Sequence, residues 1–221
     1  MGETIELTAS DGHKFQAYAT GDEKSERALV VVQEIFGVNH HMRVLSDHLA
    51  SFGYRVLAPA IFDRVERNVE LGYDEVGVKR GIALRAQIDE TDLMRDIEAT
   101  AAYLSPRATG IIGYCWGGTI AWWGATRSRN FKAAISWYGA GIVKTKEAVA
   151  NCPVQLHFGG ADKSIPPGDI ESIEQSQPDV QIFVYDGAEH GFGCDERPSF
   201  NPVANKLAEQ RSLAFFDEHL V

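Results

Sequence analysis

The chain has 221 residues, of which 44% are hydrophobic and 24% are charged, and its formal net charge is -10. This length and composition predict one soluble globular domain over residues 1–221, large enough to bury its own core. A diffuse negative charge repels nucleic-acid phosphates and anionic lipids. We therefore expect neither a nucleic-acid partner nor a membrane partner.

The amino terminus and the cysteines indicate in which cellular compartment the protein is expected. Residues 1–4 (MGET) lack the basic start and apolar stretch of a signal peptide, and the longest apolar runs are only strand-sized. The three cysteines are odd in number and lack metal-ligand spacing, which argues against a disulfide framework. We expect a cytoplasmic protein with reduced thiols, either a monomer or a small homo-oligomer.

Short apolar runs alternate along the chain with longer segments of helical periodicity. The runs expected to form buried strands are Ala28–Ile35, Tyr54–Ala60, Thr109–Tyr114, Lys132–Tyr138, Val154–Phe158 and Val180–Asp186. The clearest predicted helices are His41–Phe52, Asp89–Leu104 and Pro202–His219. This alternation predicts an α/β fold whose mostly parallel central sheet has about seven or eight strands flanked by helices.

Two further segments complete the predicted layout. Ile5–Leu7 and Lys14–Tyr18 flank a Ser-Asp-Gly turn, which predicts an antiparallel hairpin at the start of the chain. Residues 72–87 are polar and helix-like, and we interpret them as a cap over the site.

The sharpest motif is Gly113-Tyr114-Cys115-Trp116-Gly117, which follows an apolar strand and precedes a helix predicted at Thr119–Thr126. This pattern is typical of the nucleophile elbow of an α/β-hydrolase fold, where the catalytic residue sits in a strained turn between strand and helix. The helix N-terminus favours a thiolate. A buried structural cysteine is the alternative, but the strand–turn–helix context favours Cys115 as the nucleophile.

The partners of the nucleophile in this fold follow it in the order acid, then base, each in a loop after a strand. Asp162 follows the strand Val154–Phe158, and His190 follows the strand Val180–Asp186. Imidazole can take a thiol proton near neutral pH, and a carboxylate on the other ring nitrogen orients it. The sequence therefore predicts a Cys115–His190–Asp162 triad.

The other histidines compete poorly for the role of base. We expect His40 and His41 to face solvent at a helix start, and His157, inside a strand, to be a core residue with its hydrogen bonds satisfied. The sequence contains neither an HExxH motif nor a Cys/His cluster. We therefore predict no metal and no cofactor.

Four segments resemble a known family when taken in order. They are QEIFGVN at residues 33–39, GYCWGG at 113–118, GGAD at 159–162 and GAEHGF at 187–192. Together they are similar to the dienelactone hydrolases, or carboxymethylenebutenolidases, from about Ala28 to the last predicted helix. The family triad falls on Cys115, Asp162 and His190.

The resemblance implies roles for four more residues. Glu34 matches a glutamate that contacts the resting thiol and helps to generate the thiolate when substrate binds. The backbone N–H groups of Ile35 and Trp116 match the oxyanion hole, and Tyr138 matches an aromatic residue of the substrate pocket.

The sequence departs from the family pattern at the residues that bind the substrate. That substrate is a dienelactone bearing a carboxylate, which arginines bind. The position four residues after His190 is basic in well-known members but is Cys194 here. Arg197 lies three residues later as a substitute, and Lys79 or Arg80 is the candidate for the second cation. Cys194 itself is a candidate to line the site.

These features predict a hydrolase that cleaves a small lactone or ester through a cysteine acyl-enzyme. The type reaction converts 4-carboxymethylenebut-2-en-4-olide into maleylacetate. Two alternatives stay open. One is a carboxylesterase or thioesterase with a neutral substrate, and the other is a catalytically retired hydrolase fold that acts as a binding module.

Overall fold

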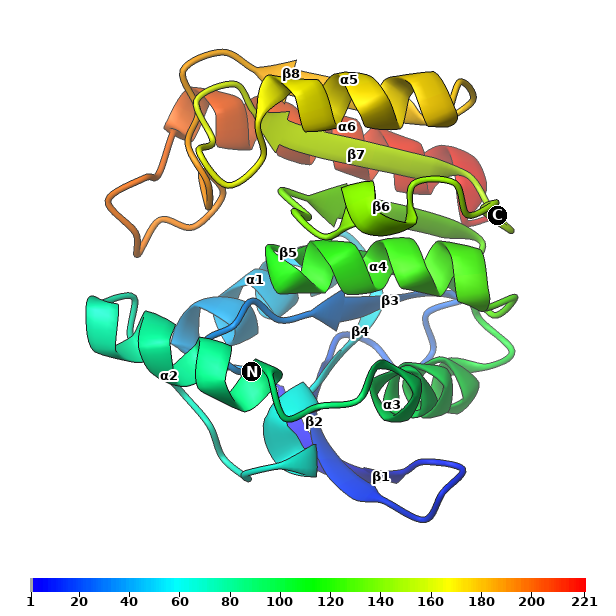
Figure 1. Ribbon diagram of the computed structural model, residues 1–221. Coiled ribbons are helices and arrows are strands. Elements are labelled where there is room, and N and C mark those ends of the chain that lie inside the picture. Colours follow the sequence, from blue (N-terminus) through cyan, green and yellow to red (C-terminus); the bar gives the residue numbers. More distant parts are fainter. Residues whose placement is uncertain (1) are drawn as a thin grey trace. The chain divides into compact units, whose positions relative to one another are not determined.

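The computed structural model describes residues 2–221, which divide into two compact units, one ending at Thr109 and the other spanning Gly110–Val221. Figure 1 labels their helices and strands. The predicted α/β fold is confirmed, because the described residues form eight strands interleaved with helices, and most neighbouring strands are parallel.

The strands of the first unit are β1 (Glu3–Thr8), β2 (Lys14–Thr20), β3 (Arg27–Val32) and β4 (Arg55–Pro59). They lie in the order β1-β2-β4-β3; β2 is antiparallel to both neighbours, and β3 is parallel to β4. The first pairing confirms the predicted hairpin. Every residue of β3 after Arg27 is buried, as expected for a parallel strand with both faces covered.

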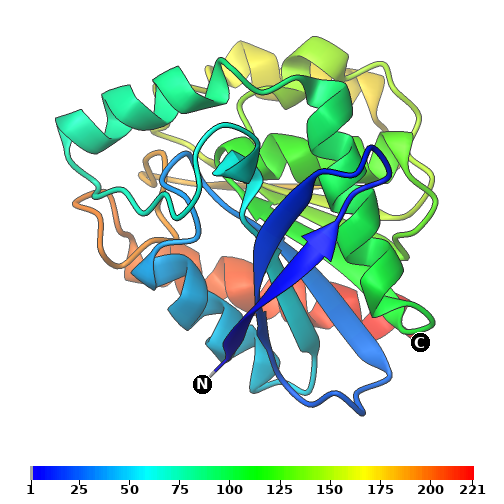
Figure 2. The same ribbon diagram turned by 90° about the horizontal axis from the view of Figure 1, so that it is seen from below.

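The helices of the first unit are α1 (His40–Ala50), the 3₁₀ helix η1 (Ile61–Arg64), α2 (Glu75–Arg85) and α3 (Glu90–Leu104). Figure 2 shows α1 and α3 on opposite faces of the strands. The Asn39 side chain caps α1 by accepting the Met42 N–H, and Asp89 caps α3 by accepting the Thr91 N–H. The segment interpreted as a cap contains α2.

The second unit contains β5 (Ala108–Tyr114) from Gly110 onward, together with β6 (Ala133–Trp137), β7 (Val154–Gly159) and β8 (Gln181–Tyr185). These strands are all parallel and lie in this order. Its helices are α4 (Trp116–Arg127), the 3₁₀ helix η2 (Ile142–Thr145), α5 (Pro167–Ser176) and α6 (Pro202–His219). Figures 1 and 2 show α4 and α5 on one face of these strands and α6 on the other. The carboxyl ends of β5, β7 and β8 therefore lie at one edge, where the predicted triad residues follow.

Three details differ from expectation. The helix predicted from Thr119 begins at Trp116, directly after Cys115. A helix that was not predicted, α5, follows the Asp162 loop. His41 is buried rather than solvent-facing, because it packs edge-on against the Tyr73 ring at a centroid distance of 6.3 Å.

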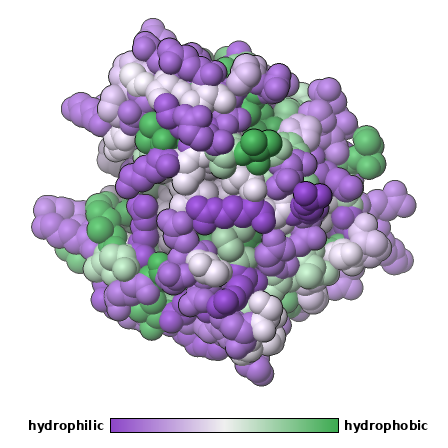
Figure 3. Space-filling view, turned by 45° about the vertical axis from the view of Figure 1, so that its right-hand side comes forward, coloured by the Kyte–Doolittle hydropathy of each residue, from purple (hydrophilic) through white to green (hydrophobic). Residues whose placement is uncertain are grey.

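Figure 3 shows a face that is mainly hydrophilic, with apolar residues in small separate groups. Among the helices of residues 2–221, none has an apolar stretch long enough to cross a bilayer.

Candidate active site

Cys115 lies in a strained turn between β5 and α4. Its φ of 57° and ψ of -116° place a non-glycine residue in a region that L-amino acids rarely adopt. Its N–H donates to the Trp137 carbonyl at 3.0 Å, and its carbonyl accepts the Gly118 N–H at 3.0 Å. These bonds fix the turn against the end of β6 and the first turn of α4, where the helix dipole favours negative charge.

Glycines allow the close approach of chain segments at this turn. A Cβ atom on Gly113 would overlap the carbonyl oxygen of Gly117, and one on Gly118 would lie 2.6 Å from the carbonyl oxygen of Trp137. The role of Gly113 follows from the sequence motif. The requirement at Gly118 depends on where β6 lies, and sequence reasoning missed it.

His190 and Asp162 are joined by a short hydrogen bond. His190 Nδ1 lies 2.7 Å from Asp162 Oδ2, and the Asp162 side chain is fully excluded from solvent. The second oxygen, Oδ1, accepts the Ser164 N–H at 2.8 Å. Both carboxylate oxygens are thus satisfied, which holds the imidazole in one orientation.

The loops that carry Asp162 and His190 are tied together through their backbones. The Gly160 N–H donates to the Tyr185 carbonyl at 2.7 Å, and the Ala161 N–H donates to the Ala188 carbonyl at 2.9 Å. A Cβ atom on Gly159 would overlap the Ala188 carbonyl oxygen. The ends of β7 and β8 therefore hold Asp162 and His190 in a fixed position relative to each other.

Cys115 shares a hydrogen bond with the same imidazole. Burial by itself lowers the pKa of His190, but the negative charge of Cys115 and the hydrogen bond to Asp162 raise it, and the net effect raises the pKa to about 10. The His190 imidazole is therefore protonated more readily than a free imidazole. Within the second unit, Cys115, His190 and Asp162 thus form one hydrogen-bonded row.

Tyr138 lies against the base. Its ring meets the His190 ring edge-on at a centroid distance of 5.1 Å, and the side chain is fully buried. Its φ of 42° is unusual for a bulky residue, and its N–H donates to the His157 carbonyl at 2.8 Å. Trp116 is also buried and occupies the first position of α4.

Arg197 is the residue of the second unit that was predicted to bind a substrate carboxylate. Its N–H donates to the carbonyl of Cys194, whose side chain is completely buried. A Cβ atom on Gly191 would overlap the Arg197 guanidinium, so this group packs directly over the residue that follows His190. A cation thus lies beside the base loop, and the role of Arg197 in substrate binding stays a prediction.

Three predicted residues belong to the first unit. Glu34 lies two residues beyond β3 with only 1% of its surface exposed, and Ile35 follows it, also buried. Arg80 is exposed on α2 and forms an ion pair with Glu66. The roles of Glu34, Ile35 and Arg80 stay predictions.

The described residues also test the expectation for His157. His157 is buried, with hydrogen bonds at both ring nitrogens, which confirms the prediction of a satisfied core histidine. Among residues 2–221, no group of three or more His, Cys, Asp or Glu side chains is arranged to hold a metal ion.

Solved structures place the fold among the α/β-hydrolases. A crystal structure of a candidate dienelactone hydrolase from Klebsiella pneumoniae matches with a TM-score of 0.85 at 28% identity, covering 99% of both chains. A dienelactone hydrolase structure from Anabaena variabilis has a TM-score of 0.73 and covers 100% of this chain and 99% of its own. Its identity of 14% shows a shared fold alone.

Sequence comparisons define the family. The model of the dienelactone hydrolase family matches residues 15–220. A candidate carboxymethylenebutenolidase of Synechocystis sp. is 38% identical over 212 residues, which cover 87% of this chain and 86% of that protein. The carboxymethylenebutenolidase of Pseudomonas putida is 29% identical, covering 97% of this chain and 96% of that protein. The chain therefore belongs to the dienelactone hydrolase family and is a carboxymethylenebutenolidase-like hydrolase, as its motifs predicted.

Proposed function

We propose that this protein hydrolyses a small lactone or ester through an acyl-enzyme on Cys115. The observation that carries the proposal is the hydrogen-bonded row of Cys115, His190 and Asp162 at the carboxyl ends of β5, β8 and β7. A nucleophile, a base and a carboxylate that orients the base are the three parts that acyl transfer needs.

The first half of the reaction forms a thioester. The Cys115 thiolate attacks the substrate carbonyl, and the oxyanion that develops is held by the Trp116 N–H at the start of α4 and by the Ile35 N–H. Oxyanion donors of this kind are usually worth about 3–4 kcal/mol each. The tetrahedral intermediate collapses, the C–O bond breaks, and the His190 imidazolium protonates the departing alkoxide or enolate.

The second half releases the acid. Neutral His190 takes a proton from water, and the resulting hydroxide attacks the thioester carbonyl. The C–S bond breaks and leaves the Cys115 thiolate beside the His190 imidazolium. Transfer of that proton to the thiolate restores the resting thiol and the neutral base. Asp162 stabilises the imidazolium in both halves without exchanging a proton.

Glu34 is proposed to control the thiol. Its carboxylate is buried just beyond β3, and the family places a glutamate there in contact with the resting thiol. A thiol kept protonated without substrate would resist oxidation. Comparing the thiol titration of wild type with that of Glu34→Gln tests the role, and identical reactivity with unchanged turnover would remove it.

The proposed substrate carries a carboxylate near the scissile bond. The support is Arg197, whose guanidinium packs beside the His190 loop, and the family to which the chain belongs. A neutral ester is the second candidate, because position 194 is a buried cysteine and Arg80 is already paired with Glu66. Turnover of 4-carboxymethylenebut-2-en-4-olide compared with a simple aryl ester separates these two candidates.

The core of the proposal is tested with two cysteine variants. Cys115→Ala is expected to lose hydrolysis of every substrate that the wild type cleaves. Cys152→Ala is the matched control, because Cys152 is also a partly buried free thiol, and burial raises its pKa to about 11. Undiminished activity of Cys115→Ala would overturn the proposal. No acyl-enzyme and no turnover with any activated ester would favour a binding module instead.

A further inference from the structure

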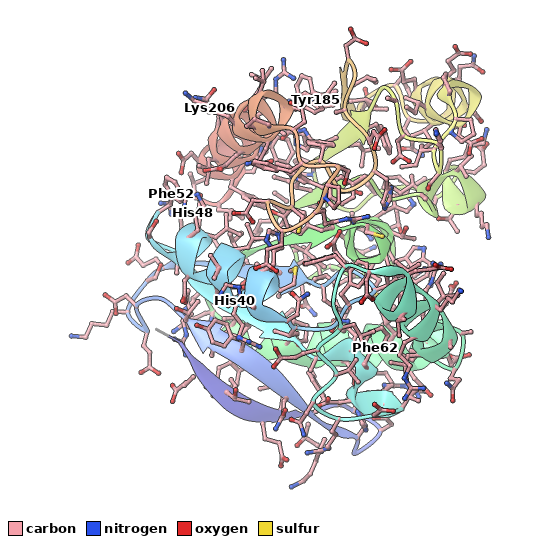
Figure 4. All side chains as sticks on the ribbon, turned by 90° about the vertical axis from the view of Figure 1, so that its left-hand side faces the viewer. His40, His48, Phe52, Phe62, Tyr185 and Lys206 are labelled. Carbon is pink, nitrogen blue, oxygen red and sulfur yellow. The ribbon has the colours of Figure 1, made fainter. Side chains whose placement is uncertain are left out.

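His157 joins three strands and a helix of the second unit through a buried polar network. Its Nδ1 lies 2.7 Å from the Tyr185 hydroxyl, and its Nε2 lies 2.8 Å from Gln155 Oε1 and 3.1 Å from the Ser212 hydroxyl. The Trp137 indole N–H donates to the same Ser212 oxygen at 3.2 Å. Tyr185, labelled in Figure 4, comes from β8, and Ser212 comes from α6.

Both ring nitrogens of His157 have partners when the imidazole is neutral and carries its proton on Nε2. Gln155 Nε2 donates to Gln181 Oε1 at 2.9 Å, so Gln155 Oε1 accepts from His157 Nε2. The Tyr185 hydroxyl then donates to Nδ1. Burial, with a contribution from the Arg211 charge, lowers the pKa of His157 to about 3, in keeping with this neutral form.

The residues that meet at His157 also support the active site with their backbones. The Trp137 carbonyl accepts the Cys115 N–H, the His157 carbonyl accepts the Tyr138 N–H, and the Tyr185 carbonyl accepts the Gly160 N–H. The side chains therefore set the spacing of three strand ends. Those strand ends hold the nucleophile turn, the aromatic residue beside the base, and the loop of the acid.

Packing extends the same support to the base loop. The ring of Phe192, two residues after His190, stacks on Trp137 at a centroid distance of 5.4 Å and contacts Tyr185 at 5.2 Å. The His157 ring lies 5.2 Å from Trp137. A change in the His157 network would thus alter the positions of Cys115, His190 and Asp162.

We propose that His157 is a positioning residue of the active site, which acts through Trp137, Tyr185 and Ser212 to keep Cys115 aligned with His190 and Asp162. This inference rests on the proposed function of that row. Buried polar networks that are fully satisfied rigidify their surroundings. A displacement of about 1 Å in a catalytic group can cost about a hundredfold in rate.

The test uses Ser212→Ala and Tyr185→Phe, each of which removes one oxygen from the network. Ser46→Ala is the matched control, because Ser46 is likewise a buried helical serine, but its hydroxyl donates to the Met42 carbonyl of its own helix. The melting temperature, kcat and KM for an aryl ester, and the pH dependence of Cys115 alkylation by iodoacetamide are measured for all four proteins. Peptide mass spectrometry separates Cys115 from the other two cysteines.

We expect both network variants to lose about tenfold in kcat with little change in KM, as for a loss of alignment. We also expect the pH dependence of Cys115 alkylation in both network variants to differ from that of wild type, because the thiol loses its alignment with His190. The control should keep both properties. Lower melting temperatures with wild-type kcat and an unchanged alkylation profile would overturn the positioning role. If the wild type itself hydrolyses no ester, the proposed function fails, while the alkylation profiles still decide the positioning role.

Discussion

His190 Nδ1 lies 2.7 Å from Asp162 Oδ2, and the Asp162 side chain is fully excluded from solvent. We expect Asp162→Asn to fold but to lose about 10³–10⁴-fold in kcat, because an amide can hold the wrong imidazole tautomer and cannot stabilise the imidazolium. Steady-state kinetics with an aryl ester measures the loss. Asp169→Asn, in the first turn of α5, is the control and should match wild type. Less than a tenfold loss in Asp162→Asn would contradict the assigned role.

The raised pKa of His190 makes a prediction about stability and pH. The unfolded imidazole titrates near 6.5, and in the folded protein its pKa rises to about 10. The folded state therefore binds the proton more tightly, so its stabilisation is complete below pH 6.5 and is lost as the pH rises through about 10. Urea unfolding of wild type and His190→Gln should give a difference in unfolding free energy that shrinks over this range. A difference that grows with pH would contradict the direction of the shift.

The nucleophile turn should not tolerate a side chain at position 113. A Cβ atom on Gly113 would overlap the Gly117 carbonyl, whereas one on Gly168, in α5, would meet nothing within 4 Å. We expect Gly113→Ala to lose most activity and about 1–3 kcal/mol of unfolding free energy through overpacking. Gly168→Ala should keep its activity and gain stability, by about 0.4–1 kcal/mol. Equal behaviour of the two variants in denaturant titrations and in ester hydrolysis would count against the elbow geometry.

The first unit contains a buried ion pair whose removal should be costly. Arg64 Nε and Nη2 donate to the two oxygens of Asp96 at 2.8 and 2.7 Å, and the Asp96 side chain is fully buried. Asp96→Ala leaves a largely buried guanidinium with fewer partners and should lower the unfolding free energy by about 3 kcal/mol.

The comparison for this ion pair is an exposed one on α2. Lys79→Ala removes the salt bridge to Glu75, in which both side chains are largely exposed, and should change stability by less than about 1 kcal/mol. Chemical denaturation of both variants checks the contrast. A loss in Asp96→Ala no larger than that in Lys79→Ala would show that the buried pair contributes little.

Much of the layout follows from the sequence because the deciding signals are local. The apolar runs at β3 and β5 to β7 are nearly continuous, as strands covered on both faces require. The order of the residues along the chain and their places after two predicted strands also suffice to predict that Asp162 lies next to His190. The hydrogen bond between them is therefore a relationship that residue types and loop positions can predict.

Other features depend on distant parts of the chain. α5 buries only Ile170 and Ile173, too few apolar residues for a clear helical period, and Pro167 was its only strong signal. His41 is buried because Tyr73 packs against it, and Gly118 is needed because β6 lies beside it. The packing of Arg197 over Gly191 likewise arises from the path of a loop, which periodicity does not describe.

The central claim is that Cys115 carries the acyl group, and mass spectrometry of protein quenched during turnover tests it most directly. Wild type, Asp162→Asn and Cys115→Ala are each treated with an aryl acetate and quenched in acid, and the peptides that contain residues 115, 152 and 194 are compared. We predict one added acetyl group on the Cys115 peptide of wild type and none on the matching peptide of Cys115→Ala. Asp162→Asn should accumulate more of the acetylated peptide if deacylation is the slower step. Acetylation at Cys152 or Cys194, or hydrolysis by wild type that leaves the Cys115 peptide unmodified under every quench time, would contradict it.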